Sequence, residues 1–342
     1  MTSIGIDQTA SLLPVIWFAV IGFAILMYVL LDGFVLGIGV LAPFAEDEQQ
    51  LDTMMNTAAP IWDGNETWLV LGGASLMAAF PRAYAIILST LYLPVLFMLA
   101  SLVLRGVSFE FRFRAGRSKP LWGACFSIGS ILAAFSQGVM LGAIAEGLPL
   151  QTSALIGSAT YWFSPFTMLT GAAVVFGYAL LGSTWLILKT DGAMQSIAYS
   201  LTRPLVAVVI AFMVLVSTSL PFLSSHIMAR WFDDNNFLWL SPVPLLALAN
   251  ALVLWRAVMR RAEVVPFLAA VSFFFLGFVG ILIGLWPNLL PPTLSIWDAA
   301  APRSSQLFVI VGLAVLLPVI LGYVWWSYHV FRGKVTASSA YH

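Results

Sequence analysis

Long apolar runs alternate with short polar connections along the whole chain, which is the pattern of a protein that crosses a membrane many times. Runs near 20 residues are long enough to span a bilayer as a helix, and the sequence contains nine of them. They are residues 12–41, 57–80, 83–105, 121–145, 164–187, 203–224, 240–259, 265–286 and 305–331. The connections are too short to hold a soluble domain, so we predict one all-α transmembrane domain over residues 1–342.

Lysine and arginine are unevenly distributed between the two sets of connections. One set, which follows the first, third, fifth and seventh runs and includes the C-terminus, carries Arg105, Arg112, Arg114, Arg117, Lys119, Lys189, Arg203, Arg256, Arg260, Arg261, Arg332 and Lys334. The other set carries Arg82, Arg230 and Arg303. Basic residues favour the cytoplasmic side. Twelve against three therefore predicts an N-terminus outside, a C-terminus in the cytoplasm and an odd number of spans.

Composition supports a membrane location and excludes several other classes. The chain is 61% hydrophobic and 9% charged, with a mean hydropathy of +0.97, whereas a soluble domain is about a quarter charged. The first run, Leu12 to Leu41, has no basic residue ahead of it and contains Asp32, so we expect a retained helix rather than a secretory signal. The single cysteine, Cys125, allows no internal disulfide. The basic residues flank membrane spans, so nucleic acid is not an expected partner.

Three acids near the cytoplasmic ends of the first two runs are the main candidates for function. Asp32 and Asp63 would lie roughly 13 and 9 Å inside the membrane at ~1.5 Å per residue, with Glu66 near the depth of Asp32. Buried carboxylates are costly and usually face a bundle interior or a wet cavity. We interpret the three as a proton path from the cytoplasm, because burial and like charge favour proton exchange near neutral pH. The alternative is a structural role in helix capping and packing.

Other polar residues near these acids are expected to support packing. Asn65 and Gln137 are typical of hydrogen bonds between membrane helices. Arg105 ends the third run on the cytoplasmic side, where we favour an interface anchor over an ion pair with one of the acids. Trp62 and Gly64 flank Asp63 in the same short motif, and we assign them a packing role.

Glycines in the first two runs predict close helix packing. Gly33, Gly37 and Gly39 lie in the first run, and Gly72 and Gly73 lie in the second. Small residues let helix backbones approach closely, so we expect the second span to be tightly packed. The alternative is that these glycines leave room for a lipid or quinone tail.

The positions of the histidines argue against a haem site within this chain. Membrane haems are typically held by His, Met with His, or Cys. The three histidines, His226, His329 and His342, all lie near helix ends or the tail. We therefore expect no haem bound through them. The sequence also contains no metal-ligand spacing, no P-loop and no nucleophile–base pair, so we assign no catalytic, cofactor-binding or metal-binding residue.

Several motifs, in order from the first span to the tail, resemble subunit II of the cytochrome bd-type quinol oxidases, including the cyanide-insensitive branch. The most specific is Trp62-Asp63-Gly64-Asn65-Glu66. The others include Leu31-Asp32-Gly33-Phe34, Ala79-Phe80-Pro81, Arg105-Gly106, Phe109-Glu110-Phe111-Arg112, Trp286-Pro287, Trp297-Asp298-Ala299-Ala300, Ser305-Gln306-Leu307 and Phe331-Arg332-Gly333-Lys334-Val335. By this match, Trp297 and Asp298 join the packing motifs.

The resemblance implies a fold, a partner and a reaction. The fold would be two four-helix bundles plus one helix, paired with a related subunit I in the bacterial cytoplasmic (inner) membrane. The partner would carry two b-type haems, one d-type haem and the quinol site. The complex would oxidise membrane quinol and reduce O₂ to water with protons from the cytoplasm. Small accessory subunits, lipid and quinone are further partners to test.

One position departs from the family pattern. The family usually reads Asp-Gly-Phe-Asp-Leu-Gly, whereas this chain has Val35 in place of the second acid, between Phe34 and Leu36. The resemblance places that acid in a proton path, so either Asp32 and Asp63 suffice here or protons enter through subunit I.

A proton-coupled secondary transporter is the alternative function. Membrane acids in a helical bundle are its only support. Transporters usually place a site near the midplane between interrupted helices, whereas the acids here lie toward one side. A transporter would also be stable alone, whereas an oxidase subunit would need its haem-bearing partner.

Overall fold

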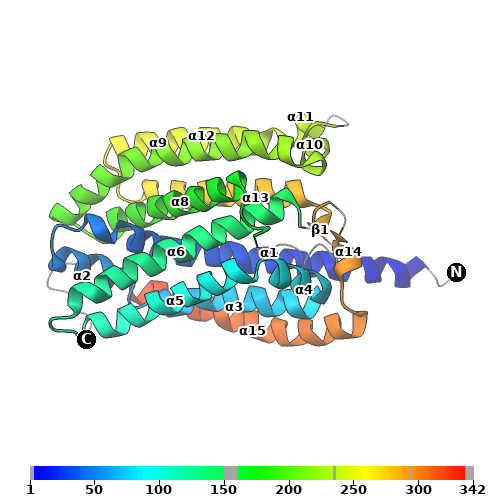
Figure 1. Cartoon of the computed structure of the whole chain (residues 1–342), viewed down its shortest axis with the longest axis horizontal. Coiled ribbons are helices and arrows are strands. Elements are labelled where there is room, and N and C mark those ends of the chain that lie inside the picture. The colour runs from blue at the N-terminus through cyan, green and yellow to red at the C-terminus, as the bar shows by residue number, and fades with distance from the viewer. Residues whose placement is uncertain (1–3, 149–159, 234–235, 293, 336–342) are drawn as a thin grey trace.

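The computed structural model describes residues 4–148, 160–233, 236–292 and 294–335. Within these described ranges, nine long helices run roughly along the long axis of the molecule (Figure 1). They are α1 (Ile4–Leu41), α3 (Trp62–Ala79), α5 (Tyr92–Arg112), α6 (Lys119–Glu146), α8 (Pro165–Lys189), α9 (Gly192–Leu223), α12 (Pro242–Met259), α13 (Val265–Leu285) and α15 (Arg303–Val330).

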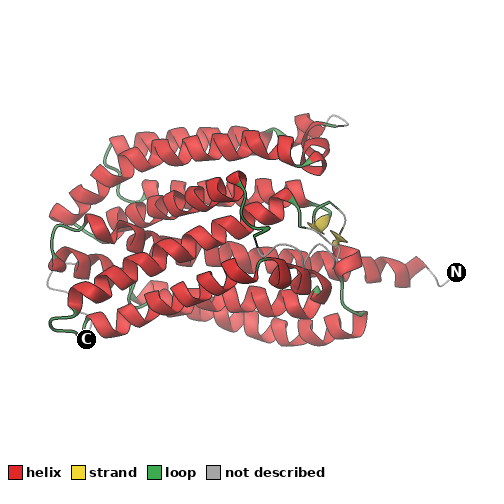
Figure 2. Cartoon of the chain, viewed as in Figure 1, coloured by secondary structure: helices red, strands yellow, loops and turns green. Residues whose placement is uncertain are grey.

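Short elements connect these helices at the two ends of the molecule. They are η1 (Ala42–Phe44), α2 (Glu48–Asn56), α4 (Pro81–Thr90), α10 (Ser225–Phe232), α11 (Asn236–Leu240), α14 (Ile296–Ala299) and the strands β1 (Asn288–Leu290) and β2 (Leu294–Ser295). The strands form one short antiparallel pair at the end near the N-terminus (Figure 2). We call the opposite end, where the C-terminal tail lies, the tail end (Figure 1).

The number of spans agrees with about nine, but several predicted boundaries are wrong, among them the start of α9, which lies at Gly192 rather than at residue 203. In the described part of the chain, eight helices are long and apolar enough to cross a membrane, or nine if α3 and α4 form one span bent by 119°. The bend falls at Phe80 and Pro81, because proline disfavours helical geometry in the preceding residue. A second break at Leu91 separates α4 from α5, so the predicted run 83–105 is two helices.

Helix α8 is central to the contacts between helices, because it packs on α1 and α6 as well as on α9 and α13. Helices α8, α9, α12 and α13 pack in a ring, and α1 contacts α3 and α6, which in turn packs on α5. Helix α15 lies against α3 at the edge of the molecule (Figure 1). This arrangement is consistent with two four-helix bundles plus one helix.

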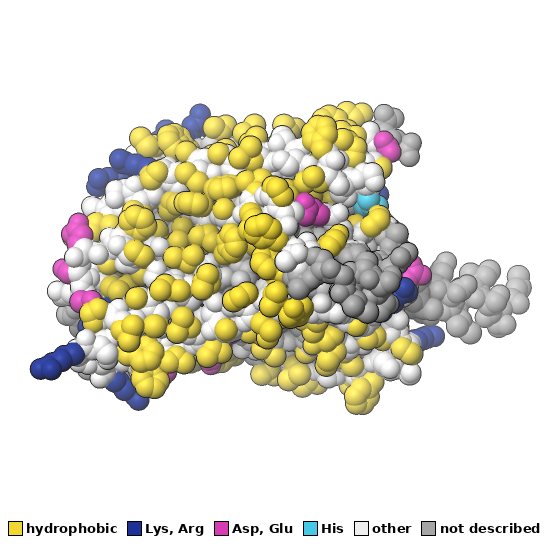
Figure 3. All heavy atoms as spheres, viewed as in Figure 1, with side chains coloured by type: hydrophobic (Ala, Val, Ile, Leu, Met, Phe, Trp, Pro, Cys, Tyr) yellow, Lys and Arg dark blue, Asp and Glu magenta, His cyan; other side chains and the backbone are white. Residues whose placement is uncertain are grey.

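Charge is distributed along the long axis as in a membrane protein. Hydrophobic side chains cover most of the visible face, and most of the visible Lys and Arg side chains lie at the tail end (Figure 3). This distribution matches the uneven basic residues of the sequence.

Glycines of α1 allow α1 and α8 to touch backbone to backbone. A Cβ added at Gly37 would lie 1.8 Å from the carbonyl oxygen of Tyr178, and one at Gly182 would lie 2.5 Å from the carbonyl carbon of Gly37. The predicted close approach of the first span is therefore confirmed. In the second span the tight packing is limited to one side of α3: an added Cβ at Gly72, which is buried, would contact Ile25 of α1 at 3.6 Å, whereas one at the exposed Gly73 meets nothing within 4 Å.

A buried lysine fastens the C-terminal tail to the end of α8. The Lys189 ammonium donates hydrogen bonds to the carbonyls of Phe331 and Gly333, the second at 2.7 Å, and lies 5.3 Å from the Trp185 ring centroid. The Lys189 carbonyl accepts a hydrogen bond from Val335 N at 2.8 Å. These contacts tie α15, most of whose surface is exposed, to the other helices.

Replacing Lys189 with methionine is expected to loosen α15 and lower the thermal midpoint of the purified protein. The change leaves tail carbonyls without their donor, at a cost of about 1–3 kcal/mol. The matched control is Lys334→Met, because Lys334 pairs with the exposed Glu263 at 2.9 Å and exposed pairs contribute little. Equal midpoints for the two variants would contradict a structural role for the Lys189 contacts.

The exposed pair also has a defined pH range. Hydrogen bonds from Lys334 and Gln195 hold the pKa of Glu263 below its usual value. The stabilisation is fully present above the ordinary pKa of glutamate and is lost as the pH falls through the lowered pKa of Glu263 in the folded state.

Candidate functional site

A buried arginine joins two of the three candidate acids. Arg105 of α5 donates from Nη2 to both carboxylate oxygens of Asp32 of α1, at 3.1 and 3.0 Å, and to Oε1 of Glu66 of α3 at 2.5 Å. Asp32 and Arg105 side chains are fully buried, whereas the Glu66 side chain is 28% exposed. We call these three residues the acid–arginine cluster. The shared guanidinium is the cation that offsets the cost of burying these two carboxylates.

The expectation that Arg105 is an interface anchor is wrong. Helix α5 continues to Arg112, so Arg105 lies two turns inside the helix and not at its end. The misplaced boundary of the third run put it at the membrane surface. The ion pair weighed as the alternative is the one that the structure contains.

Asp63 does not join the cluster. Helix α3 begins at Trp62, five residues later than the predicted run, so Asp63 lies in its first turn rather than well inside the helix. Its side chain is exposed, and it shares the outer face of α3 with the partly exposed Glu66. An acid in the first turn also interacts favourably with the helix dipole. This contact fits the alternative in which Asp63 has a structural capping role.

Asn65 and Gly64 connect α3 to its neighbours. Asn65 donates from Nδ2 to the Leu31 carbonyl of α1 at 2.8 Å and accepts from the Tyr328 hydroxyl of α15 at 3.1 Å. A Cβ added at Gly64 would lie 2.8 Å from the Tyr323 ring of α15. Both residues therefore hold α3 between α1 and α15.

A chain of hydrogen bonds leads away from Asp32 into the bundle. Tyr28, one turn earlier on α1, hydrogen-bonds to Asp32. Gln137 of α6 donates to the Tyr28 hydroxyl at 2.8 Å, and the Tyr178 hydroxyl of α8 donates to Gln137 Oε1 at 2.8 Å. The role predicted for Gln137 in bonds between helices is confirmed. The sequence analysis missed both tyrosines; the four-residue spacing from Tyr28 to Asp32 was a usable signal, whereas Tyr178 had none.

Aromatic rings lie on the tail-end side of the cluster. Trp62 stacks on Phe109 with ring centroids 5.1 Å apart, and Phe109 meets Phe126 edge to face at 5.0 Å. The Arg105 guanidinium lies 5.4 Å from the Trp62 ring centroid. The ring layer separates Arg105 from Arg112, the next buried arginine on α5.

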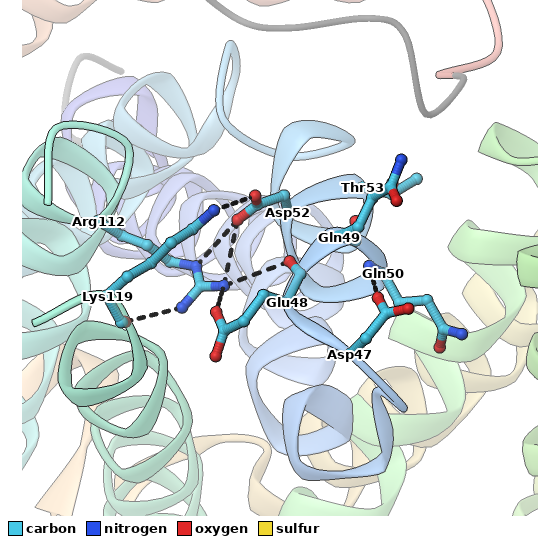
Figure 4. Close-up of polar contacts among 8 residues, drawn as sticks. All are labelled: Asp47, Glu48, Gln49, Gln50, Asp52, Thr53, Arg112 and Lys119. Atoms are coloured by element: carbon cyan, nitrogen blue, oxygen red, sulfur yellow. Dashed lines mark hydrogen bonds and ion pairs between the residues drawn. The ribbon is translucent and has the colours of Figure 1, made fainter. Parts of the chain in front are cut away.

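Arg112 organises a second ionic network at the tail end, which the sequence analysis did not anticipate (Figure 4). The fully buried Arg112 contacts Glu48 at 2.5 Å and Asp52 at 3.1 Å on α2, and donates to the Lys119 carbonyl at 2.9 Å. The Lys119 ammonium pairs with Asp52 in turn. The network fixes α2 against the ends of α5 and α6.

Trp297 and Asp298 lie at the other end, on α14. Asp298 accepts a hydrogen bond from the Ser295 hydroxyl at 2.5 Å, and Ser295 caps the helix by accepting from Asp298 N at 3.2 Å. Trp297 meets Trp286 edge to face at 6.0 Å. These contacts stabilise a turn far from the acid–arginine cluster.

The described histidines occupy opposite ends of the molecule. His226 Nε2 lies 3.1 Å from Asn288 Nδ2, and His329 stacks on Trp325 at the tail end. His342 lies outside the described residues. Within the described ranges no three His, Cys, Asp or Glu side chains are grouped to hold a metal ion, and the two histidines do not face a common site.

The fold and the cluster define a polytopic α-helical membrane protein with buried ion-paired side chains between its helices. The chain belongs to the cytochrome bd terminal oxidase subunit II family, whose model matches residues 13–331. It is therefore a subunit of a membrane quinol:O₂ oxidoreductase.

Similar proteins agree over almost the whole chain. The probable cytochrome oxidase subunit 2 of Haemophilus influenzae is 28% identical, covering 94% of this chain and 95% of that protein. Cytochrome bd ubiquinol oxidase subunit 2 of Bacillus subtilis is 27% identical, with 94% and 96% covered. Cytochrome bd-I ubiquinol oxidase subunit 2 of Escherichia coli K12 is 26% identical, with 95% and 96% covered.

A solved structure shows the same fold. The structure of bd oxidase from Geobacillus thermodenitrificans matches with a TM-score of 0.76 at 17% identity, covering 93% of this chain and 98% of that chain. These likenesses favour the oxidase subunit over the transporter alternative.

Proposed function

We propose that this chain assembles with a haem-bearing subunit I and lines a proton path to it from the cytoplasm. The partner holds two b-type haems and one d-type haem, and the complex oxidises quinol and reduces O₂ to water. The N-terminus lies outside and the C-terminus in the cytoplasm, in agreement with the basic tail end (Figure 3).

The observation that carries the proposal is the outer face of α3. It exposes Asp63 and part of Glu66 next to the apolar Val70 and Met77, which are 69% and 52% exposed. Charged groups within a membrane helix are unfavourable against lipid. A partner subunit that covers this face would shield both acids and receive protons from them.

The assembly is tested by purifying the tagged chain from native membranes in mild detergent, recording the visible difference spectrum and the co-purifying chains. We expect haem absorbance together with a second membrane chain, and loss of that absorbance when the second chain is removed. A colourless, monodisperse single chain would overturn the proposal and make proton flux in liposomes the next measurement.

Replacing Asp63 with asparagine is expected to preserve assembly and slow O₂ reduction together with proton uptake. The loss should be smaller than the roughly 100-fold typical of a direct acid–base group, because water can bypass an exposed carboxylate. Glu110→Gln is the control, since Glu110 is an exposed acid near the end of α5. Normal turnover with full haem content would remove Asp63 from the path, and loss of the haems would indicate a structural role.

A further inference from the structure

Every contact of the Asp32 carboxylate is with a hydrogen-bond donor. Arg105 Nη2 donates to both oxygens, and Tyr28 is the neighbouring hydroxyl. The donors are themselves oriented, because Tyr178 donates to Gln137 and Gln137 donates to Tyr28, which leaves the Tyr28 proton to point at Asp32. A protonated Asp32 would have to donate its own hydrogen. Arg105 cannot accept it, and Tyr28, whose oxygen already accepts from Gln137, would have to turn its hydrogen away from Asp32.

Glu66 is held much less completely. Only Oε1 contacts Arg105, and within the described residues Oε2 has no hydrogen-bond donor. The side chain is 28% exposed, whereas Asp32 and Arg105 are fully buried. Glu66 is therefore the member of the cluster that touches both the buried guanidinium and the outside.

The surroundings of the cluster leave the Glu66 side as its open side. The stacked rings of Trp62 and Phe109, with Phe126 behind them, separate Arg105 from the tail end. The charged groups that face Glu66 are Arg105 of α5, Asp32 of α1 and Asp63 of its own helix. From α15, Tyr328 donates to Asn65.

We propose that Glu66 is the carboxylate that takes up and releases the proton, whereas Asp32 remains the fixed counter-ion of Arg105 and is positioned by Tyr28 and Gln137. This inference rests on the proposed proton path and assigns its groups. The proton is added at Oε2 of Glu66 along the face of α3 that Glu66 shares with Asp63, and it leaves from the same group toward the covering partner. Arg105 keeps its two bonds to Asp32 in both states.

The test compares Glu66→Gln, Glu66→Asp and Asp32→Asn in the intact two-subunit oxidase, with Glu110→Gln as the matched control. Haem content, quinol-driven O₂ uptake and its pH profile are measured for each. We expect Glu66→Gln to keep its haems, lose roughly tenfold or more in turnover and change its pH profile. Glu66→Asp should recover part of the rate, because it restores the carboxylate. Asp32→Asn should lower the yield of haem-containing complex, while the complex that forms keeps the wild-type pH profile.

The outcomes separate this inference from the proposal on which it rests. Full turnover of Glu66→Gln beside a slow Asp63→Asn would overturn the assignment of Glu66 and leave the proton path in place. Full turnover of both, with complete haem content, would overturn the path itself. Loss of the haems in both Glu66 variants would show that Glu66 is structural and would overturn the inference. A changed pH profile in Asp32→Asn with an unchanged one in Glu66→Gln would exchange the two roles and also overturn it.

Discussion

Replacing Gly37 with alanine is expected to abolish recovery of the assembled oxidase. The added Cβ would lie 1.8 Å from the Tyr178 carbonyl oxygen and 2.9 Å from Gly182 N. Both are backbone atoms, so the contact is relieved only by moving α1 and α8 apart. Overpacking a core usually costs about 1–3 kcal/mol where side chains can adjust, and here they cannot.

The measurement is the yield of haem-containing complex from membranes, with the thermal midpoint of whatever is recovered. Gly277→Ala on α13 is the matched control, because an added Cβ there meets nothing within 4 Å. Separation of α1 and α8 would also pull Tyr178 away from Gln137, which it contacts at 2.8 Å. A Gly37→Ala complex with the same yield and midpoint as the control would show that the two helices can separate at little cost.

The helical architecture was predictable because membrane helices are recognised by their length and hydropathy. The positions at which the helices break were not predictable from the sequence. Leu91 interrupts a run that is apolar on both sides, so hydropathy alone has no signal there. That single error moved the expected end of α5 by about two turns and turned Arg105 from a buried ion-pair partner into a surface anchor.

The candidate site was predictable in part. Asp32 and Glu66 lie on antiparallel neighbours at similar depth, which is why their proximity could be expected. Whether Asp63 faced inward could not be expected, because three-residue spacing on a helix leaves open which side a neighbour covers. Contacts such as Tyr178 with Gln137 join residues 41 positions apart and depend on the crossing of α6 and α8.

Replacing Arg105 with methionine is expected to be among the most damaging single changes in the cluster. It leaves the fully buried Asp32 carboxylate without its cation, and breaking a buried ion pair in this way costs about 3–5 kcal/mol. Asp32→Asn should cost less, because the remaining guanidinium keeps Glu66 as a partner. The two substitutions differ in cost because Arg105→Met leaves a buried carboxylate unpaired, whereas Asp32→Asn leaves a guanidinium that is still paired.

The double variant Asp32→Asn with Arg105→Met decides whether stranded charge is the cause. It removes both charges of the buried ion pair at once. The remaining acid, Glu66, is partly exposed and can be hydrated or protonated. We expect its yield of haem-containing complex and its thermal midpoint to exceed those of Arg105→Met alone. If the double variant is as unstable as Arg105→Met, the loss comes from the volume and shape of the Arg105 side chain against Trp62, from which its guanidinium lies 5.4 Å away, rather than from an unpaired charge. In that case the stability of the cluster depends on packing rather than on charge pairing.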